Sequence, residues 1–255
     1  MIKTPYWAFI CLIFLFVACH YDNVYDRYFE GGDTLVPVPE KGMLALLSLD
    51  GSLANQSNTG VSVSVPGTLE YISGVDGKDS SALHLSGYPQ CITLSNLGMI
   101  DTLSVFFWFR ADEPYTGDYP PTLFDYGVSG LTVRIDGVSG QTLLTSAQKS
   151  TSYTTQNWVN TYNTWNFLYA EAGADTLRIM YRGSLLNGEA IEVDEKMASP
   201  GSLDPLTDIL YIGRSANGEA YQRSYFTGGI DNVRIFSRPL SRAELLSLIN
   251  EDTAN

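Results

Sequence analysis

The sequence predicts an all-β domain in which two antiparallel sheets stack as a jelly-roll sandwich that a short C-terminal helix closes. Between residues 43 and 236, short apolar or alternating runs recur roughly every ten residues, separated by Gly, Asn, Asp and Ser clusters. No stretch before Ser241 shows a competing helical period. So many short strands in one domain are expected to form two packed sheets.

The chain begins with a predicted targeting segment, residues 1–18. Lys3 supplies its positive start, and the apolar run from Ala8 to Ala18 is too short to span a bilayer as a mature helix. The run ends in Leu15-Phe16-Val17-Ala18-Cys19, which resembles the bacterial lipobox. That resemblance implies that Cys19 is lipidated and becomes the new N-terminus. The alternative is an ordinary cleavable signal peptide with a chance cysteine.

Residues 19–41 are interpreted as a tether between the lipid and the folded domain, residues 42–255. The tether is acidic and contains Gly31-Gly32, while Pro37 and Pro39 stiffen its exit. Asp22 close behind the cysteine resembles the acidic start of surface-exported lipoproteins of the Bacteroidetes type. We therefore expect a protein that is lipid-anchored to the outer membrane or the cell surface.

The cysteines fit this interpretation. With Cys11 in the leader and Cys19 carrying lipid, Cys91 is left alone in the folded part, so no intramolecular disulfide is expected. Cys91 lies in an apolar run and is predicted to be a small buried side chain.

The expected strands follow the apolar runs in chain order. They cover residues 43–48, 61–65, 82–85, 91–94, 103–110, 122–126, 131–135, 165–170, 176–181, 189–193, 209–212 and 228–236, with further strands between 141 and 162. In 103–110 apolar residues occupy both faces, so both faces should be covered. Trp108 and Trp165 are accordingly interpreted as packing residues and not as sugar platforms.

In the last expected strand, Val233 and Ile235 alternate with Asn232 and Arg234, which places Asp231 on the core-facing side. A buried carboxylate is costly unless it is paired, so backbone N–H groups or a cation are expected beside it.

A helix of about two turns is predicted after this strand. Pro239 prevents further ladder pairing, and Ser241 and Glu244 have the S-x-x-E spacing of a capping box.

The final strand and helix also carry a family resemblance. Residues at fixed spacing match the phrase F-x-G-x-I-D-x-V-R-I-(Y/F)-x-x-x-L-S-x-x-E-(L/I): Phe226, Gly228, Ile230, Asp231, Val233, Arg234, Ile235, Phe236, Leu240, Ser241, Glu244 and Leu245. This phrase resembles the C-terminal signature of the laminin-G-like, concanavalin A-like lectin and glucanase family. Further phrases of the family are matched upstream, in order, at 47–51, 81–87, 103–110, 164–167 and 210–214.

The resemblance implies a concanavalin A-like jelly roll and, as in many relatives, a structural calcium where the first and last strands meet. Asp50 and Asp231 would be its ligands, with carbonyl oxygens completing the shell. The alternative is that Asp231 accepts backbone N–H bonds and no metal is involved.

Candidate glycan contacts lie in the polar stretch TSYTTQNWVNTYNT. Tyr153, Trp158 and Tyr162 are aromatic residues with polar handles on an otherwise polar segment, which suits stacking on sugar rings. The alternative is that these aromatics lie on the edge of the sandwich.

Catalysis is not expected. Related jelly rolls include glycoside hydrolases with an E-x-D-x-x-E strand, but here Glu192, Asp194 and Glu195 are followed by Met197 where the third carboxylate is needed. The sequence has no Ser-His-Asp arrangement, HExxH motif or paired-cysteine metal spacing. His84 takes the place of an aromatic in the family phrase and is interpreted as packing or hydrogen bonding.

The net charge of −13 excludes nucleic acid as a partner, because its phosphates would be repelled. Three functions stay open: a lipid-anchored extracytoplasmic carbohydrate-binding module of a glycan-capture system, a protein-interaction or adhesion domain of the cell envelope, and a glycoside hydrolase. The fold alone does not separate the first two.

Overall fold

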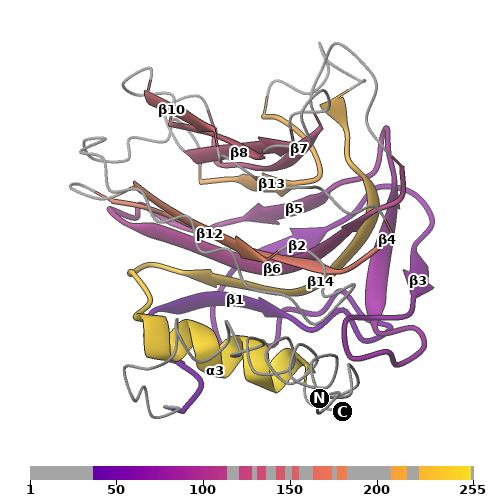
Figure 1. Ribbon diagram of the computed structural model, residues 1–255, viewed down its shortest axis with the longest axis horizontal. Helices are drawn as coiled ribbons and strands as arrows, with labels where there is room; N and C mark the ends of the chain where they lie inside the picture. The colour runs from indigo at the N-terminus through magenta and orange to yellow at the C-terminus, as the bar shows by residue number, and fades with distance from the viewer. Residues whose placement is uncertain are drawn as a thin grey trace, which may run out of the picture. The chain divides into compact units, whose positions relative to one another are not determined.

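The computed structural model describes residues 37–113, 121–127, 131–135, 142–146, 151–154, 163–173, 177–182, 208–216 and 224–253, the backbone alone for 142–146, 151–154 and 177–182. Within these residues two antiparallel sheets of seven strands each stack face to face, as Figure 1 shows. The predicted all-β sandwich is confirmed.

The first sheet has the strand order β12-β11-β6-β14-β4-β3, and β1 also pairs with β14. Its strands are β1 (Met43–Leu47), β3 (Glu70–Ile72), β4 (Ala82–Ser86), β6 (Leu103–Ala111), β11 (Asn166–Ala172), β12 (Leu177–Arg182) and β14 (Thr227–Phe236). The helix α3 (Arg242–Thr253) follows β14 and lies on the face of this sheet that points away from the second sheet (Figure 1).

The second sheet has the order β10-β9-β8-β7-β13-β5-β2. Its strands are β2 (Ser62–Ser64), β5 (Ile92–Ser95), β7 (Thr122–Asp125), β8 (Leu131–Ile135), β9 (Thr142–Ser146), β10 (Thr151–Thr154) and β13 (Leu210–Ile212). The predicted strands that fall within the described residues are present with small shifts of their ends, whereas β3 was not predicted. The predicted strand 189–193 lies outside the described residues.

The core lies between the sheets and is built by alternation. On β6, Val105, Phe107 and Phe109 point into it and are fully buried, as are Phe124 of β7 and Ile212 of β13 across the gap. Each such side chain contributes roughly 1.5–3 kcal/mol by leaving water. Cys91 is also buried and free, as predicted.

The other face of β6 carries Phe106 and Trp108, and both are buried as well. The Trp108 Nε1–H donates to Asp252 of α3 at 2.9 Å, and the Trp108 ring meets Phe167 of β11 edge-on at 5.7 Å. Coverage of both faces of this strand is therefore confirmed, and Trp108 is a packing residue under the helix.

Strand β14 contains a bulge that changes the side on which Asp231 lies. Asp231 pairs with Trp108 and Arg234 pairs with Phe106, so the segment from Asp231 to Arg234 holds one residue more than the β6 segment opposite. Asn232 adopts a left-handed φ of 48° there. The prediction that Asp231 faces the core between the sheets is wrong, because the extra residue puts Asp231 on the outer face with Arg234.

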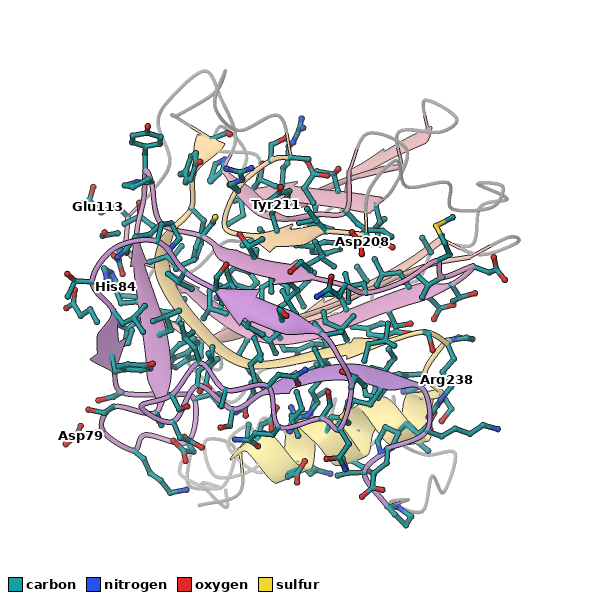
Figure 2. The ribbon with its side chains drawn as sticks, turned by 180° about the vertical axis from the view of Figure 1, so that it is seen from behind. Asp79, His84, Glu113, Asp208, Tyr211 and Arg238 are labelled. Atoms are coloured by element: carbon teal, nitrogen blue, oxygen red, sulfur yellow. The ribbon has the colours of Figure 1, made fainter. Side chains whose placement is uncertain are left out.

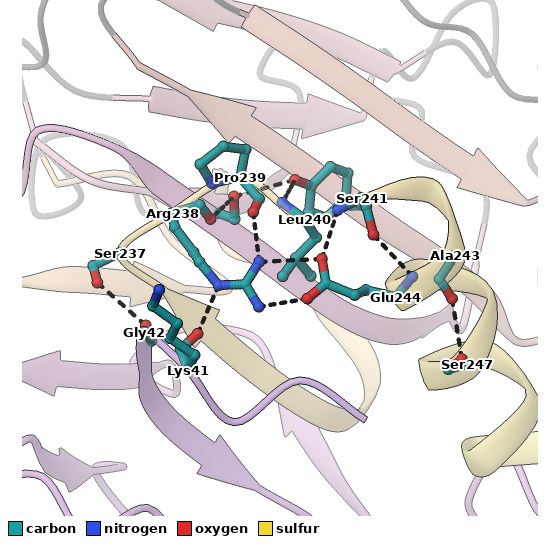
Figure 3. A network of polar contacts seen from close by, with 12 residues as sticks. Lys41, Gly42, Ser237, Arg238, Pro239, Leu240, Ser241, Ala243, Glu244 and Ser247 are labelled. Atoms are coloured by element: carbon teal, nitrogen blue, oxygen red, sulfur yellow. Dashed lines mark hydrogen bonds and ion pairs between the residues drawn. The ribbon is translucent and has the colours of Figure 1, made fainter. Parts of the chain in front are cut away.

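The start of α3 has the predicted capping box (Figure 3). Glu244 accepts from the Ser241 N–H at 2.8 Å, and the Ser241 hydroxyl accepts from the Glu244 N–H at 3.3 Å. Hydrogen bonds from Arg238 lower the pKa of Glu244 to about 2. Arg238 also donates to the Lys41 carbonyl at 2.7 Å, so this turn holds the chain entering β1. The helix has 12 residues and is longer than the two turns predicted.

The far end of α3 is held to the sheet by a buried ion pair. Arg234 donates through Nη1 and Nη2 to the two carboxylate oxygens of Asp252, at 2.8 and 2.6 Å. The Arg234 side chain is 5% exposed and that of Asp252 is 2% exposed, whereas Glu251, also bound by Arg234, is 52% exposed. Among the described helices, none is long and apolar enough to cross a membrane.

Removing the Asp252 carboxylate should therefore destabilise the folded protein. Asp252→Ala leaves the Arg234 guanidinium buried without its main partner and frees the Trp108 N–H, which should reduce the free energy of unfolding by about 3–5 kcal/mol. The matched control Glu251→Ala removes an exposed partner of the same arginine and should cost less than about 1 kcal/mol. Urea unfolding measures the stability of both variants. Equal reductions in the free energy of unfolding would contradict the conclusion that Asp252 is the main partner of Arg234.

Candidate functional site

A polar pocket of about 640 Å³ opens beside the bulge of β14. The bulge, the end of β1 with the loop after it, the turn 74–81 and the end of α3 line this pocket. The structure thus brings Asp50 and Asp231 to one pocket, as the family resemblance implies. Asp50 is exposed, whereas Asp231 is 1% exposed.

Asp231 is only partly satisfied by the residues around it. Its Oδ2 accepts from the Val75 N–H at 2.9 Å. Its Oδ1 is buried and has no hydrogen-bond partner in the described part of the chain. Burial raises the pKa of Asp231 to about 7, and the nearby carboxylates of Asp252 and Asp50 act in the same direction, while the backbone N–H groups of Val75 and Asn232 lower it.

The turn that covers Asp231 needs a glycine. A Cβ on Gly74 would lie 2.2 Å from the Ser81 hydroxyl and 2.6 Å from Asp231 Oδ2. The Gly74 N–H donates to that hydroxyl at 3.0 Å, and the Ser81 hydroxyl donates to the Lys78 carbonyl at 2.8 Å. Oxygen atoms from a carboxylate, a carbonyl and a hydroxyl therefore gather at this turn, which packs against Asp231 Oδ2.

These oxygen atoms are of the types that bind a hard cation. Calcium accepts carbonyl and hydroxyl oxygens together with carboxylates, and a cation would compensate the buried charge of Asp231. Within the described ranges no three His, Cys, Asp or Glu side chains converge as a ligand set. Any calcium bound here would therefore depend on main-chain and hydroxyl oxygens besides Asp231.

A second group of residues, which the sequence reasoning missed, gathers at the turn between β4 and β5 and the end of β13. We name Tyr88, Tyr211, Arg214 and Tyr225 the tyrosine–arginine cluster. The Arg214 guanidinium lies over the Tyr211 ring at 4.1 Å and donates through Nη1 to the Tyr225 hydroxyl at 3.2 Å. Tyr88 meets the Tyr225 ring edge-on at 5.4 Å and is 54% exposed. Tyr211 is labelled in Figure 2.

A weak signal for this cluster exists in the sequence. Tyr211 stands between the buried residues Leu210 and Ile212, so it belongs to the outward face of β13. Tyr88 precedes Pro89 in a turn between strands. Nothing in the linear order indicates that these segments meet, because Tyr211 and Tyr88 are far apart in sequence.

A third polar group crosses the outer face of the first sheet. His84, labelled in Figure 2, bonds through Nε2 to Asp112 at 2.7 Å, with Glu70 at 3.5 Å from Nδ1. The prediction that His84 serves hydrogen bonding is thus confirmed. The Trp165 ring packs so close to Gly229 that a Cβ there would lie 2.7 Å from the ring. This contact agrees with the interpretation of Trp165 as a packing residue.

The other sequence candidates cannot be placed as sites. Tyr153 lies on β10, where its backbone pairs with Leu144. The structure describes only the backbone of this strand. Cys19, Trp158, Tyr162 and the segment 192–197 lie outside the described residues.

The two stacked antiparallel sheets and their closing helix define a concanavalin A-like jelly roll. The family model described as the concanavalin A-like lectin/glucanases superfamily, of the laminin G type, matches residues 86–246, more than half of the chain. The protein belongs to this superfamily. No curated protein sequence matches it significantly.

Solved structures share the fold at low identity. Domain 4 of AbnA, an extracellular arabinanase from Geobacillus stearothermophilus solved with arabinotriose, has a TM-score of 0.59 and 20% identity, covering 81% of this chain and 97% of that domain. The binding domain of botulinum neurotoxin DC, solved with SialylT, has a TM-score of 0.57 and 15% identity, covering 83% of this chain. A structure of botulinum neurotoxin type C, whose cell entry depends on two ganglioside molecules, has a TM-score of 0.58 and 14% identity, covering 85% of this chain. This chain spans about half the length of both neurotoxin structures, 52% of each.

The burial of Asp231 predicts a pH-dependent stability. Below about pH 4 this carboxyl is protonated in both states; between about pH 4 and 7 the unfolded chain ionises first, so folding loses on the order of 4 kcal/mol from this group. In a calcium chelator, the free energy of unfolding should thus fall as pH rises through this window, and less so in Asp231→Asn. The exposed pocket residue Asp79 provides the control: Asp79→Asn should keep the wild-type slope. Equal slopes for wild type and Asp231→Asn would refute the assignment.

Proposed function

We propose that the protein is a non-catalytic carbohydrate-binding module, held outside the cytoplasm by a lipid on Cys19, and that it serves glycan capture. The tyrosine–arginine cluster carries this proposal, because it joins an exposed aromatic ring to a fixed hydrogen-bond donor. A sugar ring presents an apolar face to an aromatic side chain and hydroxyls to polar groups around it. The presence of arabinotriose in the structurally similar arabinanase domain supports the same class of ligand.

The cluster is rigid enough to serve as a site. Tyr211 lies on β13, which pairs with β5 on one side and β7 on the other. Tyr225 is 7% exposed, so its ring is fixed and supports Tyr88. Binding at such a surface requires little ordering of side chains, which lowers the entropic cost of association.

Shortening Tyr88 should weaken glycan binding without unfolding the domain. Because stacking and burial of one ring contribute roughly 1–3 kcal/mol, Tyr88→Ala should weaken affinity about tenfold or more while the melting temperature stays nearly unchanged. Met99, which is 83% exposed and outside the cluster, provides the control Met99→Ala. A glycan array followed by calorimetric titration makes the measurement. If no glycan binds and pull-downs from the cell envelope recover a protein through the same cluster, the adhesion alternative replaces this proposal.

The anchor is tested separately. Lipidation at Cys19 rests on the apolar run ending in Val17-Ala18-Cys19, and two acyl chains hold a protein stably at about 0.8 kcal/mol per buried CH₂. Cys19→Ser should release the protein from the membrane fraction or block removal of the leader. Normal processing together with unchanged membrane fractionation of this variant would exclude the lipid.

We also propose that a calcium ion supports the fold at the pocket of Asp50 and Asp231. The unpartnered, buried Oδ1 of Asp231 supports this assignment. When the free energy of unfolding is measured across the same pH range by urea unfolding, added calcium should raise it above neutral pH and flatten its pH dependence, and Asp231→Asn should not respond. An unchanged unfolding midpoint with and without EDTA would leave Asp231 as a hydrogen-bond acceptor alone.

A further inference from the structure

Arg214 differs from Arg234 and Arg238 in what neutralises its charge. Arg234 is paired with Asp252 and Glu251, and Arg238 is paired with Glu244. No carboxylate of the described residues lies within ion-pair distance of Arg214. Arg110 shares this lack of an acidic partner among the described residues, so what sets Arg214 apart is its contact with Tyr225, which meets the exposed Tyr88 ring.

Neutral groups hold this guanidinium in place. It lies over the Tyr211 ring at 4.1 Å, and Nη1 donates to the Tyr225 hydroxyl at 3.2 Å. Its Nε is buried and has no acceptor within the described part of the chain. Because burying a donor without an acceptor destabilises the fold, this arrangement does not serve stability by itself.

Cys91, the remaining neighbour of the Arg214 guanidinium, does not supply a negative charge either. Burial raises the pKa of the Cys91 thiol, so this group is neutral at pH 7. The guanidinium therefore keeps its positive charge, and within the described ranges its one hydrogen bond is the one to Tyr225. A planar guanidinium of this kind pairs with carboxylate or sulfate oxygens through two parallel hydrogen bonds.

The position of the charge beside an exposed ring defines the ligand. Tyr225 contacts both the guanidinium and the Tyr88 ring, which is 54% exposed. A sugar that stacks on Tyr88 can thus present a charged substituent toward Arg214. We propose that the tyrosine–arginine cluster selects acidic glycans, with Arg214 binding the carboxylate or sulfate group of the sugar. This inference rests on the proposed function, since it names the class of glycan taken by the same site.

Arg110 provides a matched comparison within the same chain. It also lies beside an aromatic ring, with its guanidinium 5.4 Å from the Trp165 ring centre, and its Nε is also buried without a partner. It differs in its neighbourhood, because Asp112 follows on the same chain segment and Trp165 is packed against the Gly229 backbone. Replacing Arg110 therefore changes the net charge equally without touching the cluster.

The test compares ligands that differ only in charge. Trigalacturonic acid, its methyl ester and a sulfated heparin-derived oligosaccharide are titrated into the mature protein and into Arg214→Gln, Arg214→Lys and Arg110→Gln. Wild type and Arg110→Gln should bind at least one of the anionic probes about tenfold or more tightly than the ester. Arg214→Gln should lose that preference while keeping its thermal stability, and Arg214→Lys should restore only part of it because an ammonium lacks the planar fork.

The outcomes separate this inference from the proposed function. Equal binding of acid and ester by wild type, or a preference that persists in Arg214→Gln, overturns the acidic-glycan inference while glycan binding itself stands. Binding of the anionic probes that Arg214→Gln abolishes and Tyr88→Ala leaves unchanged supports the anion site and removes the sugar platform. If none of the three probes and no glycan on an array binds, both the inference and the proposed function fail. A preference between carboxylate and sulfate identifies which acid the site takes.

Discussion

The bulge in β14 is the constraint on which the rest of the first sheet depends. β14 pairs with β6 along its length, with β4 over its first half and with β1 over its second half. One extra residue, Asn232, lets the strand keep Ile230 and Val233 in the core while Asp231 and Arg234 both point outward. Without it, the alternation would carry one of these charges into the apolar layer, where an unpaired ion is not tolerated.

The outward turn of these two charges explains where the helix lies. Arg234 receives the carboxylate of Asp252, and the same carboxylate accepts from Trp108, so three elements meet at one buried ionic contact. At the other end, Arg238 holds both the helix cap and the entry to β1. Asp231, on the same face, has no such partner for one of its oxygens in the part of the chain that the structure describes. Within the described residues, the pocket at Asp231 is thus the place where the bulge leaves a carboxylate only partly compensated, and the calcium proposal rests on this feature.

Alternation of apolar residues was sufficient to predict the sandwich, because most strands bury one face or both. It missed β3, because none of its residues Glu70–Ile72 is fully buried and the segment shows no clear apolar face. It misplaced Asp231, since a bulge shifts the period and Asn232 carries no signal that distinguishes it from an ordinary outward residue. The helix was predicted too short because Glu251 and Asp252 look like a polar terminus, although Asp252 is held in the sheet by Arg234.

The pocket of Asp50 and Asp231 could be anticipated from the family phrase, whereas the tyrosine–arginine cluster could not. Its members come from three segments, which the pairing of β13 with β5 and of β14 with β4 brings together. Pairing register is set by the whole sheet and not by the local sequence.

The arginines that stabilise the fold differ from Arg214, which we assign to ligand recognition, in how their charges are compensated. Arg234 and Arg238 are neutralised by carboxylates of the protein itself, so their charges contribute to folding and are not available to a ligand. The Tyr211 ring and the Tyr225 hydroxyl orient the Arg214 guanidinium. Both groups are uncharged, so they fix its position without neutralising its positive charge. Because the fold is shared by proteins with unrelated ligands, specificity has to come from such local departures. An arginine held by neutral groups beside an exposed tyrosine ring is the local departure on which the acidic-glycan proposal rests.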